Sequence, residues 1–407
     1  MPSPHLVLLG GGHATLPSLA RAHEWTAAGI DVTLVDPQRH LYYSGMVPEY
    51  LGGVYAEDEM RIDLARMARA AGATYVQARA EAIDPTARTV ATEAEGDLPY
   101  DVLSIDVGSA NPAVPAPAIA TKPIARIRAL ATQVQGTIDT PGAGLRLIVV
   151  GGGAAGTEVA LNVTGRFVGA GRGGDLDLTV IEQADRLLPG FPAGMRADAT
   201  ARLRGRGARV QTGTTVTAVE PRGDGTRTVR TDTVPDATAD AVLWATGTVG
   251  PPLLHTSPLP TNDQGFLRTH RSLQVQAHPR IFAAGDCAAI DDLDLAKVGV
   301  HAVKQGPLLR TNLDRTLRAL TDTNAVPQPR DLGTFRPYPL TPLILSTGTS
   351  DGLWTAGPLW AAHPWLLRLK HWVDRRWIRP YAPEQWGDAS WRDVLGAESA
   401  TSPGRVG

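Results

Sequence analysis

The sequence predicts an α/β fold with two domains built on the same plan, followed by a smaller C-terminal α+β segment. A short apolar strand that opens into glycines occurs twice, as LVLLGGGHAT at Leu6–Thr15 and as LIVVGGGAAG at Leu147–Gly156. Each copy continues into helix-like sequence and then into a second strand that ends in an acid, Asp36 or Glu182. With 407 residues, the chain is also long enough to bury more than one hydrophobic core.

The composition is that of a globular protein. Hydrophobic residues make up 43% and charged residues 20%, which leaves no room for a largely disordered chain. The net charge of -2 gives no long-range attraction to nucleic acid, so no nucleic-acid partner is expected. Cys287 is the single cysteine, and no intramolecular disulfide can form. Because neither a signal peptide nor a membrane-spanning stretch is recognisable, we expect a cytoplasmic protein.

The spacing within each copy fits a dinucleotide. The first glycine, Gly10 or Gly151, allows the tight turn after the strand, and the second, Gly12 or Gly153, lets the backbone approach a pyrophosphate. The following helix offers unpaired N–H groups to the phosphates, and the acid binds a ribose hydroxyl. Glycine is favoured at any strand-turn-helix junction, but two motifs with strand, helix and acid in register favour two Rossmann-like dinucleotide-binding domains.

The two copies differ at the third glycine. Gly156 occupies this position in the second copy, whereas the first has Thr15, so helix and strand must pack there around a β-branched side chain. The acid also follows at a longer distance in the second copy, because of the glycine-rich stretch Gly169–Gly174, a predicted surface loop.

Two dinucleotide sites in one chain suggest a tightly held cofactor and one that exchanges, as in a flavin enzyme that uses nicotinamide. FAD and NAD(P)H are the expected pair. NADH is the preferred form, because Glu182 would repel the 2'-phosphate of NADPH, although Arg186 lies close enough in sequence to weaken this preference.

Further motifs resemble those of flavoproteins with two dinucleotide domains. IFAAGDCA at Ile281–Ala288 resembles the FAD contact in which an aspartate, here Asp286, meets the ribityl chain. LWATG at Leu243–Gly247 resembles the strand and turn that close the NAD domain, and YDVLSIDVGS at Tyr100–Ser109 holds the matching place in the FAD domain.

Two longer segments are similar to type II NADH dehydrogenase-like flavoproteins, above all to the branch fused ahead of selenide water dikinase. They are HLYYSGMVPEYLGG at His40–Gly53 and KVGVHAVKQGPLLRTNL at Lys297–Leu313, and the resemblance covers about residues 5 to 380. It implies a split FAD domain (1–115 and 261–330), an inserted NAD(P)H domain (116–260) and a C-terminal segment (331–407) that covers the flavin or meets the membrane. The motifs and the resemblance together imply Gly10, Gly12, Asp36, Ser44, Met46, Gly285, Asp286 and Val298 for FAD, and Gly151, Gly153, Gly156, Glu182 and Gly247 for NAD(P)H.

Two side chains are candidates for a catalytic role. Lys297 is expected to begin a helix running towards Leu320, where its ammonium and the helix N-terminus would stabilise the negative charge of the reduced flavin. The alternative is a solvated residue at a helix start, and Pro307 either kinks this helix or marks its real start. Glu158 resembles a family glutamate that faces flavin and nicotinamide, although the helix dipole favours an acid in the first turn of any helix.

The lone Cys287 cannot relay electrons as the paired cysteines of disulfide reductases and sulfide:quinone reductases do. We expect it to be a small buried residue beneath the flavin, so that the acceptor takes electrons from the flavin directly. No spacing suggests a metal site, and His13 and His301 have no partners that indicate catalysis.

The stretch at Trp365–Tyr381 bears on the identity of the acceptor. At helical spacing, tryptophans and aliphatic residues face one way and basic residues the other, which is typical of a helix lying in a membrane interface. Arg376 could reach water from within the apolar face. The alternative is that the tryptophans pack on the FAD domain. The apolar face comprises Trp365, Leu369, Trp372, Val373 and Trp377, and the basic face Arg368, His371, Arg375 and Arg379.

The sequence therefore predicts an FAD-dependent NADH dehydrogenase of the type II-like group, peripheral on the cytoplasmic face of the membrane and passing electrons to a quinone. Two alternatives stay open. One is a soluble NAD(P)H reductase for a protein or selenium-related acceptor, and the other is a flavin-binding redox sensor. The sequence leaves the oligomeric state open.

Overall fold

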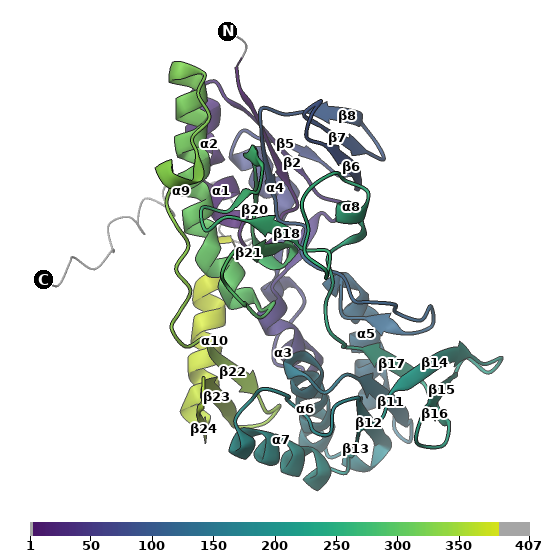
Figure 1. Cartoon of the computed structure of the whole chain (residues 1–407). Helices are drawn as coiled ribbons and strands as arrows, with labels where there is room; N and C mark the ends of the chain where they lie inside the picture. Colours follow the sequence, from purple (N-terminus) through teal and green to yellow (C-terminus); the bar gives the residue numbers. More distant parts are fainter. Residues whose placement is uncertain (1–2, 382–407) are drawn as a thin grey trace, which may run out of the picture.

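The structure, a computed structural model, describes residues 3–381. It contains two α/β units, one above the other in Figure 1, with a C-terminal segment beside both. We call the upper one the first unit and the lower one the second unit. This architecture confirms the predicted fold class.

The first unit is built on an eight-stranded sheet of order β21-β18-β19-β20-β9-β1-β2-β5. At its centre, β1 runs parallel to β2 and β9, and β20 runs parallel to β9. The residues of β1 from Leu6 to Leu9 are fully or almost fully buried, as expected for a strand covered on both faces. The strands are β1 (His5–Leu9), β2 (Asp31–Val35), β5 (Thr74–Val76), β9 (Val102–Ile105), β18 (Leu267–Thr269), β19 (Gln274–Val275), β20 (His278–Ala283) and β21 (Ala288–Ile290).

The second unit is built on a five-stranded parallel sheet of order β10-β17-β11-β12-β13. The chain enters this sheet between Ile105 and Ile119 and leaves it between Trp244 and Leu267, so the second unit is inserted into the first. Its elements are β10 (Ile119–Ala120), α5 (Ile127–Asp139), β11 (Leu145–Val150), α6 (Ala154–Gly169), β12 (Leu176–Glu182), α7 (Ala193–Gly205), β13 (Arg209–Thr212), the antiparallel strands β14 (Val216–Pro221), β15 (Arg227–Thr231) and β16 (Ala237–Ala239), and β17 (Ala241–Trp244).

The third-glycine position separates the two copies of the motif as expected. At Gly156, in the first turn of α6, a Cβ would lie 2.0 Å from the carbonyl oxygen of Gly151, so only glycine lets the helix pack this closely on the loop. In the first copy, the buried Thr15 precedes a helix of five residues, α1 (Leu16–Ala20), which Arg21 separates from α2 (Ala22–Ala27).

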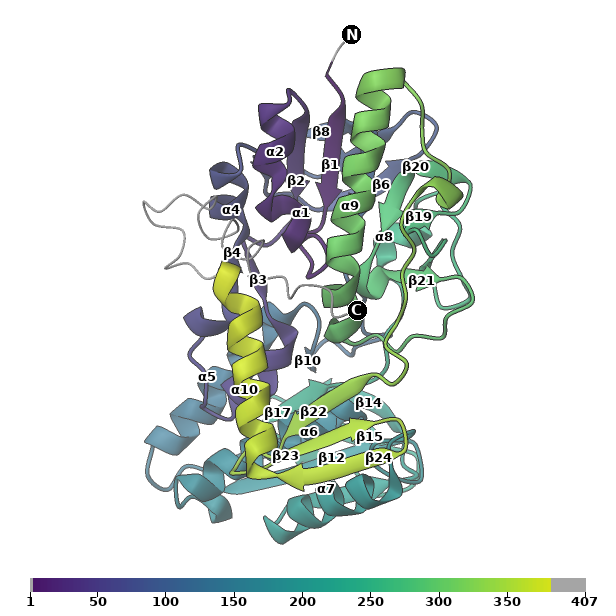
Figure 2. The same ribbon diagram turned by 90° about the vertical axis from the view of Figure 1, so that its left-hand side faces the viewer.

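The C-terminal segment consists of three antiparallel strands and α10 (Pro364–Ile378), which packs on the strands (Figure 2). His363 caps this helix by accepting the N–H of Trp365 at 3.2 Å, and Pro364 occupies its first position. No helix within residues 3–381 combines the length and the apolar character needed to cross a bilayer. The strands are β22 (Pro342–Ser346), β23 (Gly352–Ala356) and β24 (Leu359–His363).

The helix predicted to start at Lys297 starts later. It is α9 (Gly299–Thr323), with Val298 in extended conformation at its N-cap, and Lys297 lies outside it. That prediction was wrong, and Pro307 lies inside the helix rather than at its start.

The remaining elements are β3 (His40–Tyr42), the short helix η1 (Ser44–Met46), α3 (Val47–Leu51), η2 (Asp58–Met60), β4 (Arg61–Asp63), α4 (Leu64–Ala70), β6 (Ala80–Asp84), β7 (Thr89–Thr92), β8 (Gly96–Pro99), η3 (Ile124–Arg126), η4 (Gly173–Asp175), α8 (Pro252–His255), η5 (Gly285–Cys287), η6 (Pro329–Asp331) and η7 (Arg379–Tyr381).

Candidate functional site

Two glycine loops with equivalent geometry follow the carboxyl ends of β1 and β11. Gly10 has φ +91° and Gly151 φ +107°, conformations that favour glycine. The N–H of each donates to the neighbouring strand, to Val35 or to Ile181, at 2.8 Å. A Cβ at Gly10 would lie 2.4 Å from the backbone oxygen of Asp106, which follows β9, and one at Gly151 would lie 2.5 Å from that of Ala245, which follows β17. The same tight turn is therefore built twice.

The two acids also occupy equivalent positions. The carboxylate of Asp36 accepts the N–H of Gly11 at 2.8 Å and of Gln38 at 2.7 Å. Glu182 accepts the corresponding pair, from Gly152 and, at 2.8 Å, from Ala184. Each carboxylate oxygen keeps a lone pair that a ribose hydroxyl could use. Their predicted role in ribose binding is consistent with this geometry.

Arg186 does not pair with Glu182, the acid of the second motif. Its guanidinium pairs with the exposed carboxylate of the adjacent Asp185. The predicted preference for NADH therefore depends chiefly on Glu182.

Unpartnered polar atoms lie beside both loops, as a bound dinucleotide would require. Nε2 of His13 in the first loop and Oγ1 of Thr246 after β17 are buried and have no hydrogen-bond partner among residues 3–381. Buried polar atoms are nearly always paired, so both fit a polar ligand. Cβ atoms at Gly153 and Gly247 would meet no atom within 4 Å, which leaves space beside the second loop. Burial lowers the pKa of His13 to about 4, so its ring is neutral at pH 7.

Asp106 supports the first loop, a contact that the sequence analysis missed. Its Oδ2 accepts the N–H of Ala14 at 2.8 Å and of Thr15 at 2.9 Å. Burial raises the pKa of Asp106 to about 7. The equivalent position in the second unit is Ala245, which has no such acceptor. The sequence signal was an acid at the end of an otherwise apolar strand, within YDVLSIDVGS.

Beyond the first loop and Asp36, the predicted flavin-side residues come from three separate segments: η1, η5 and the N-cap of α9. Asp286 lies in η5 directly after Gly285, and its carboxylate pairs with Lys122 at 2.6 Å. Ser44 lies in η1 and is exposed, and its hydroxyl oxygen would be 3.4 Å from a Cβ at Gly299, so the start of α9 adjoins η1.

Met46 and Val298 lie close to these segments. The side chain of Met46 is fully buried in the core, which leaves its backbone as the part able to meet a ligand. Val298 caps α9. The roles of these residues in FAD binding stay predictions.

Lys297 is held by groups other than a helix start. Its ammonium donates to the carbonyl oxygen of Ala288 and lies 4.1 Å from the centre of the Phe266 ring. Burial lowers the pKa of Lys297. The N-terminus of α9 is therefore not part of the same group as the Lys297 ammonium, although the prediction assumed that it was. The action of Lys297 on the flavin stays a prediction.

Cys287 is a buried structural residue, as expected. Its side chain is fully buried, and Sγ lies 3.1 Å from the carbonyl oxygen of Ala284. Burial raises the pKa of the thiol to about 12, so the nucleophilic thiolate is not formed at neutral pH.

A buried cluster of charged residues joins α10 to the first unit, and the sequence analysis missed it. The Lys370 ammonium contacts the fully buried Glu49 carboxylate of α3, Asp374 at 2.8 Å and the Gly45 carbonyl oxygen at 2.7 Å. His371, assigned to the basic outer face, lies 2.5 Å from the other oxygen of Glu49. The available signal was a lysine and an aspartate one helical turn apart.

Glu158 links the C-terminal segment to the second unit. It lies in α6 beyond the first turn, so the alternative in which the helix dipole accounts for this acid is wrong. Its carboxylate accepts the N–H of Ser346 at the end of β22 at 2.7 Å. Burial raises the pKa of Glu158 to about 8, while the Lys370 charge acts in the opposite direction.

The Glu158→Gln variant is expected to flatten the pH dependence of stability. Glu158 binds its proton more tightly in the folded than in the unfolded state, so it contributes stability below its ordinary pKa of 4.5 that is lost as pH rises through about 8. The wild-type protein should therefore lose stability relative to Glu158→Gln between these two values. Urea unfolding at intervals of pH measures the difference, and parallel curves for the two proteins would contradict the prediction.

The outer face of α10 differs from the prediction at one end. Trp365 is 53% exposed, Trp372 57% and Val373 44%, as a membrane-facing surface requires. Trp377, assigned to the same face, instead stacks on Tyr43 with ring centres 4.2 Å apart. It points inward because α10 ends over the first unit, where His13 also lies against its ring.

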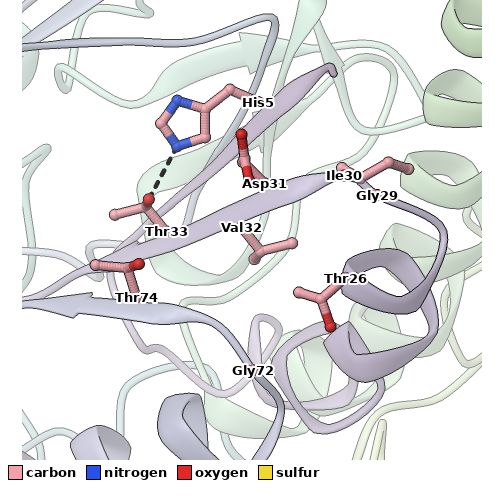
Figure 3. Close-up of a pocket in the computed structure, with 9 residues that line it drawn as sticks. All are labelled: His5, Thr26, Gly29, Ile30, Asp31, Val32, Thr33, Gly72 and Thr74. Carbon is pink, nitrogen blue, oxygen red and sulfur yellow. Dashed lines mark hydrogen bonds between the residues drawn. The ribbon is translucent and has the colours of Figure 1, made fainter. Parts of the chain in front are cut away.

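The cavity drawn in Figure 3, of about 430 Å³, lies away from the glycine loops. Its lining includes His5 and Asp31, the first residues of β1 and β2, so it opens at the amino ends of the strands. Ligands of parallel α/β sheets bind at the carboxyl ends. Within residues 3–381, no group of three or more His, Cys, Asp or Glu side chains is arranged to hold a metal ion.

Comparisons with known proteins agree with this architecture. The demethylphylloquinone reductase of Synechocystis is 29% identical over 299 residues, which cover 70% of this chain and 72% of that protein. The type II NADH:quinone oxidoreductase of Staphylococcus saprophyticus is 22% identical over 77% of this chain and 82% of its own length. The structure of NDH2 from Plasmodium falciparum in complex with NADH matches with a TM-score of 0.73 at 14% identity, over 93% of this chain and 99% of that one.

None of these three names concerns selenide water dikinase, and the resemblance to that branch stays a prediction. A family model described as pyridine nucleotide-disulphide oxidoreductase matches residues 4–306, which hold both glycine loops, both acids and Asp286. Although a single cysteine departs from the disulphide chemistry in that description, the chain belongs to the pyridine nucleotide-disulphide oxidoreductase family.

Proposed function

We propose that the protein is an FAD-dependent NADH:quinone oxidoreductase of the type II kind. The observation that carries the proposal is the pair of equivalent glycine loops whose sheets meet at their carboxyl edges. Lys122, just beyond β10 in the second unit, reaches Asp286, just beyond β20 in the first. Two dinucleotides bound at these edges would have their ring ends close together.

FAD, when bound, supplies the redox chemistry by accepting a hydride from the nicotinamide and passing two electrons on. The task of the protein is to bind and orient both dinucleotides. The loops at Gly10 and Gly151 receive the pyrophosphates, and Asp36 and Glu182 hold the riboses. Asp286 receives the ribityl hydroxyls, and the neutral His13 can donate to a phosphate oxygen.

Quinone is the acceptor that the site supports best. Reduction of a quinone to a quinol takes up two protons along with two electrons, so a proton source is needed near the flavin. Glu158, with its pKa raised to about 8 by burial, carries a proton at neutral pH. It lies between the second glycine loop and the Lys370 cluster, which adjoins η1. Both relatives described above are named for the reduction of quinones.

A steady-state assay with the purified protein tests the proposal. The protein should be yellow and oxidise NADH over many turnovers when a soluble quinone is supplied, with a higher kcat/KM for NADH than for NADPH. A protein that binds no flavin would refute the proposal. A single reduction without turnover would favour the redox sensor, and turnover with a protein acceptor but not with quinone would favour the soluble reductase.

We also propose that the exposed face of α10 binds a membrane surface, where hydrophobic quinones are dissolved. Trp365, Trp372 and Val373 form its apolar part. Exposed arginines adjoin it, and the guanidinium of Arg376 lies 5.5 Å from the centre of the Trp372 ring. Tryptophans beside basic residues are typical of helices that lie at the interface of anionic bilayers.

Replacing both Trp365 and Trp372 with serine should weaken binding to anionic vesicles by at least about tenfold, because most of the apolar area is removed. Vesicle sedimentation measures the bound fraction. The matched control is the double variant Val54→Ser and Val168→Ser, since both valines are 45% exposed and lie outside α10. Equal partition of the tryptophan variant and the wild type would contradict this role for α10.

A further inference from the structure

A lysine of the second unit lies against the aspartate proposed to hold FAD. The Lys122 ammonium is 2.6 Å from Oδ2 of Asp286 and also contacts Ser109. The Lys122 side chain is 28% exposed and that of Asp286 21%, so the pair is partly shielded from water. A charge in such a place acts more strongly on its surroundings than one on the surface.

These contacts determine which oxygen of Asp286 is free. Lys122 and Ser109 both bond to Oδ2, and Oδ1 has no hydrogen-bond partner in the part of the chain that the structure describes. Burial acts to raise the pKa of Asp286, but the Lys122 ammonium outweighs this effect. The pKa of the carboxyl therefore lies below its ordinary value. Asp286 is thus an ionised acceptor with one oxygen left for a ligand hydroxyl.

The main chain at Lys122 is fixed by Asn111. The side-chain oxygen of Asn111 accepts the N–H of Lys122 at 3.0 Å and the hydroxyl of Thr121 at 3.1 Å. Asn111 lies where the chain crosses into the second unit, beside the bridge between Ala110 and Val249. Lys122 is therefore anchored in the second unit while its charge lies in the first.

Lys297, the cation that the sequence favoured, has a different environment. Its ammonium is bonded to a carbonyl oxygen of β21 and lies over the Phe266 ring. No ion pair joins it to Asp286 among residues 3–381. Of these two ammonium groups, the one bonded to the carboxylate is that of Lys122.

We propose that Lys122 is the cation of the flavin site, which orients the Asp286 carboxylate and favours the reduced flavin over the oxidised one. The inference rests on the proposed function. A hydride brings two electrons and one proton to the flavin, so the ring carries one negative charge at neutral pH, and a fixed ammonium stabilises that charge. Lys122 is a positioning residue for Asp286 and belongs to the unit that would hold the nicotinamide.

The midpoint potential of the bound flavin tests this inference. In the full-length Lys122→Met variant saturated with FAD, the preference for reduced over oxidised flavin should fall by about tenfold, the effect of one charge-assisted contact. This corresponds to a potential more negative by about 30 mV for a two-electron couple. Lys122→Arg, which keeps the charge, should restore the wild-type potential.

The control is Lys304→Met, which removes the same charge from a lysine that packs on Tyr338, and its potential should equal that of the wild type. An unchanged potential in Lys122→Met would overturn the inference, as would a shift found in Lys297→Met but not in Lys122→Met. Should circular dichroism reveal that Lys122→Met is unfolded, Lys122→Gln is measured by the same criterion. A wild-type protein without flavin would refute the proposed function instead, and the two failures are thus distinguishable.

Discussion

Replacing Lys370 with methionine should destabilise the protein by about 3–5 kcal/mol, the usual cost of removing one partner from a buried ion pair. Glu49 is fully buried, and the Asp374 side chain is 6% exposed, so both carboxylates would stay in a dry environment without their shared cation. His371 could compensate in part by taking up a proton, because it already contacts Glu49. The helices α3 and α10, which meet at this cluster, should separate first.

Urea unfolding measures the loss, and limited proteolysis reports whether α10 becomes accessible. The matched control is Arg368→Met, which removes a positive charge from the exposed face of the same helix and should change the free energy of unfolding little. The same Lys370→Met variant should reduce quinone more slowly than the wild type. The Lys370 charge lowers the pKa of Glu158, so without it Glu158 releases its proton less readily. Wild-type stability in Lys370→Met would contradict the burial of the ion cluster.

Replacing Gly10 with alanine should abolish FAD binding, the largest effect expected of any single change in the first loop. The added Cβ would lie 2.4 Å from the backbone oxygen of Asp106, a distance that Cβ atoms do not adopt, so strand or loop must move. Because backbone lies on both sides of this contact, no side-chain rotation can relieve it. The turn that would bring the backbone of Gly12 close to the pyrophosphate would be lost.

Gly29→Ala is the matched control. Gly29 has φ +81°, close to the +91° of Gly10, but a Cβ there would meet no atom within 4 Å. Both variants pay about 1–2 kcal/mol for the left-handed conformation, and only Gly10→Ala adds the close contact. Flavin absorbance of the purified proteins and titration with FAD distinguish them. If Gly10→Ala retained flavin like Gly29→Ala, the position of the first dinucleotide would have to be revised.

The features that sequence could predict are those set by local backbone requirements. Gly10 and Gly151 must be glycine because the turn after each strand requires a positive φ and a close approach, and such demands leave a mark in the sequence. The acids Asp36 and Glu182 end strands at recognisable spacing. The two-sheet fold and both loops followed from these local signals.

The features that sequence missed depend on contacts between distant segments. Lys370 meets Glu49 across 321 residues, and Lys122 meets Asp286 across 164. Helical spacing on α10 distinguishes an apolar from a polar side, but it cannot reveal that a charged lysine packs inward against a buried acid. Hydrophobicity alone placed Trp377 on the outer face for the same reason, although Tyr43 provides its stacking partner.

The start of α9 illustrates a smaller error of the same origin. Lys297 is as good a helix former as its neighbours, and nothing local excludes it from the helix. In the structure, Val298 adopts an extended conformation and Lys297 bonds to β21, so a tertiary contact determines where the helix begins.

The position of the C-terminal segment restricts how the two α/β units can move apart. α10 is bound to the first unit through Glu49 and Tyr43, and its strands are bound to the second through the contact of Ser346 with Glu158. A hinge opening of the two units would have to break this buried ion cluster or the contact of β22 with α6. We therefore expect a nicotinamide to exchange between turnovers through local displacement of loops and side chains rather than through rigid-body opening.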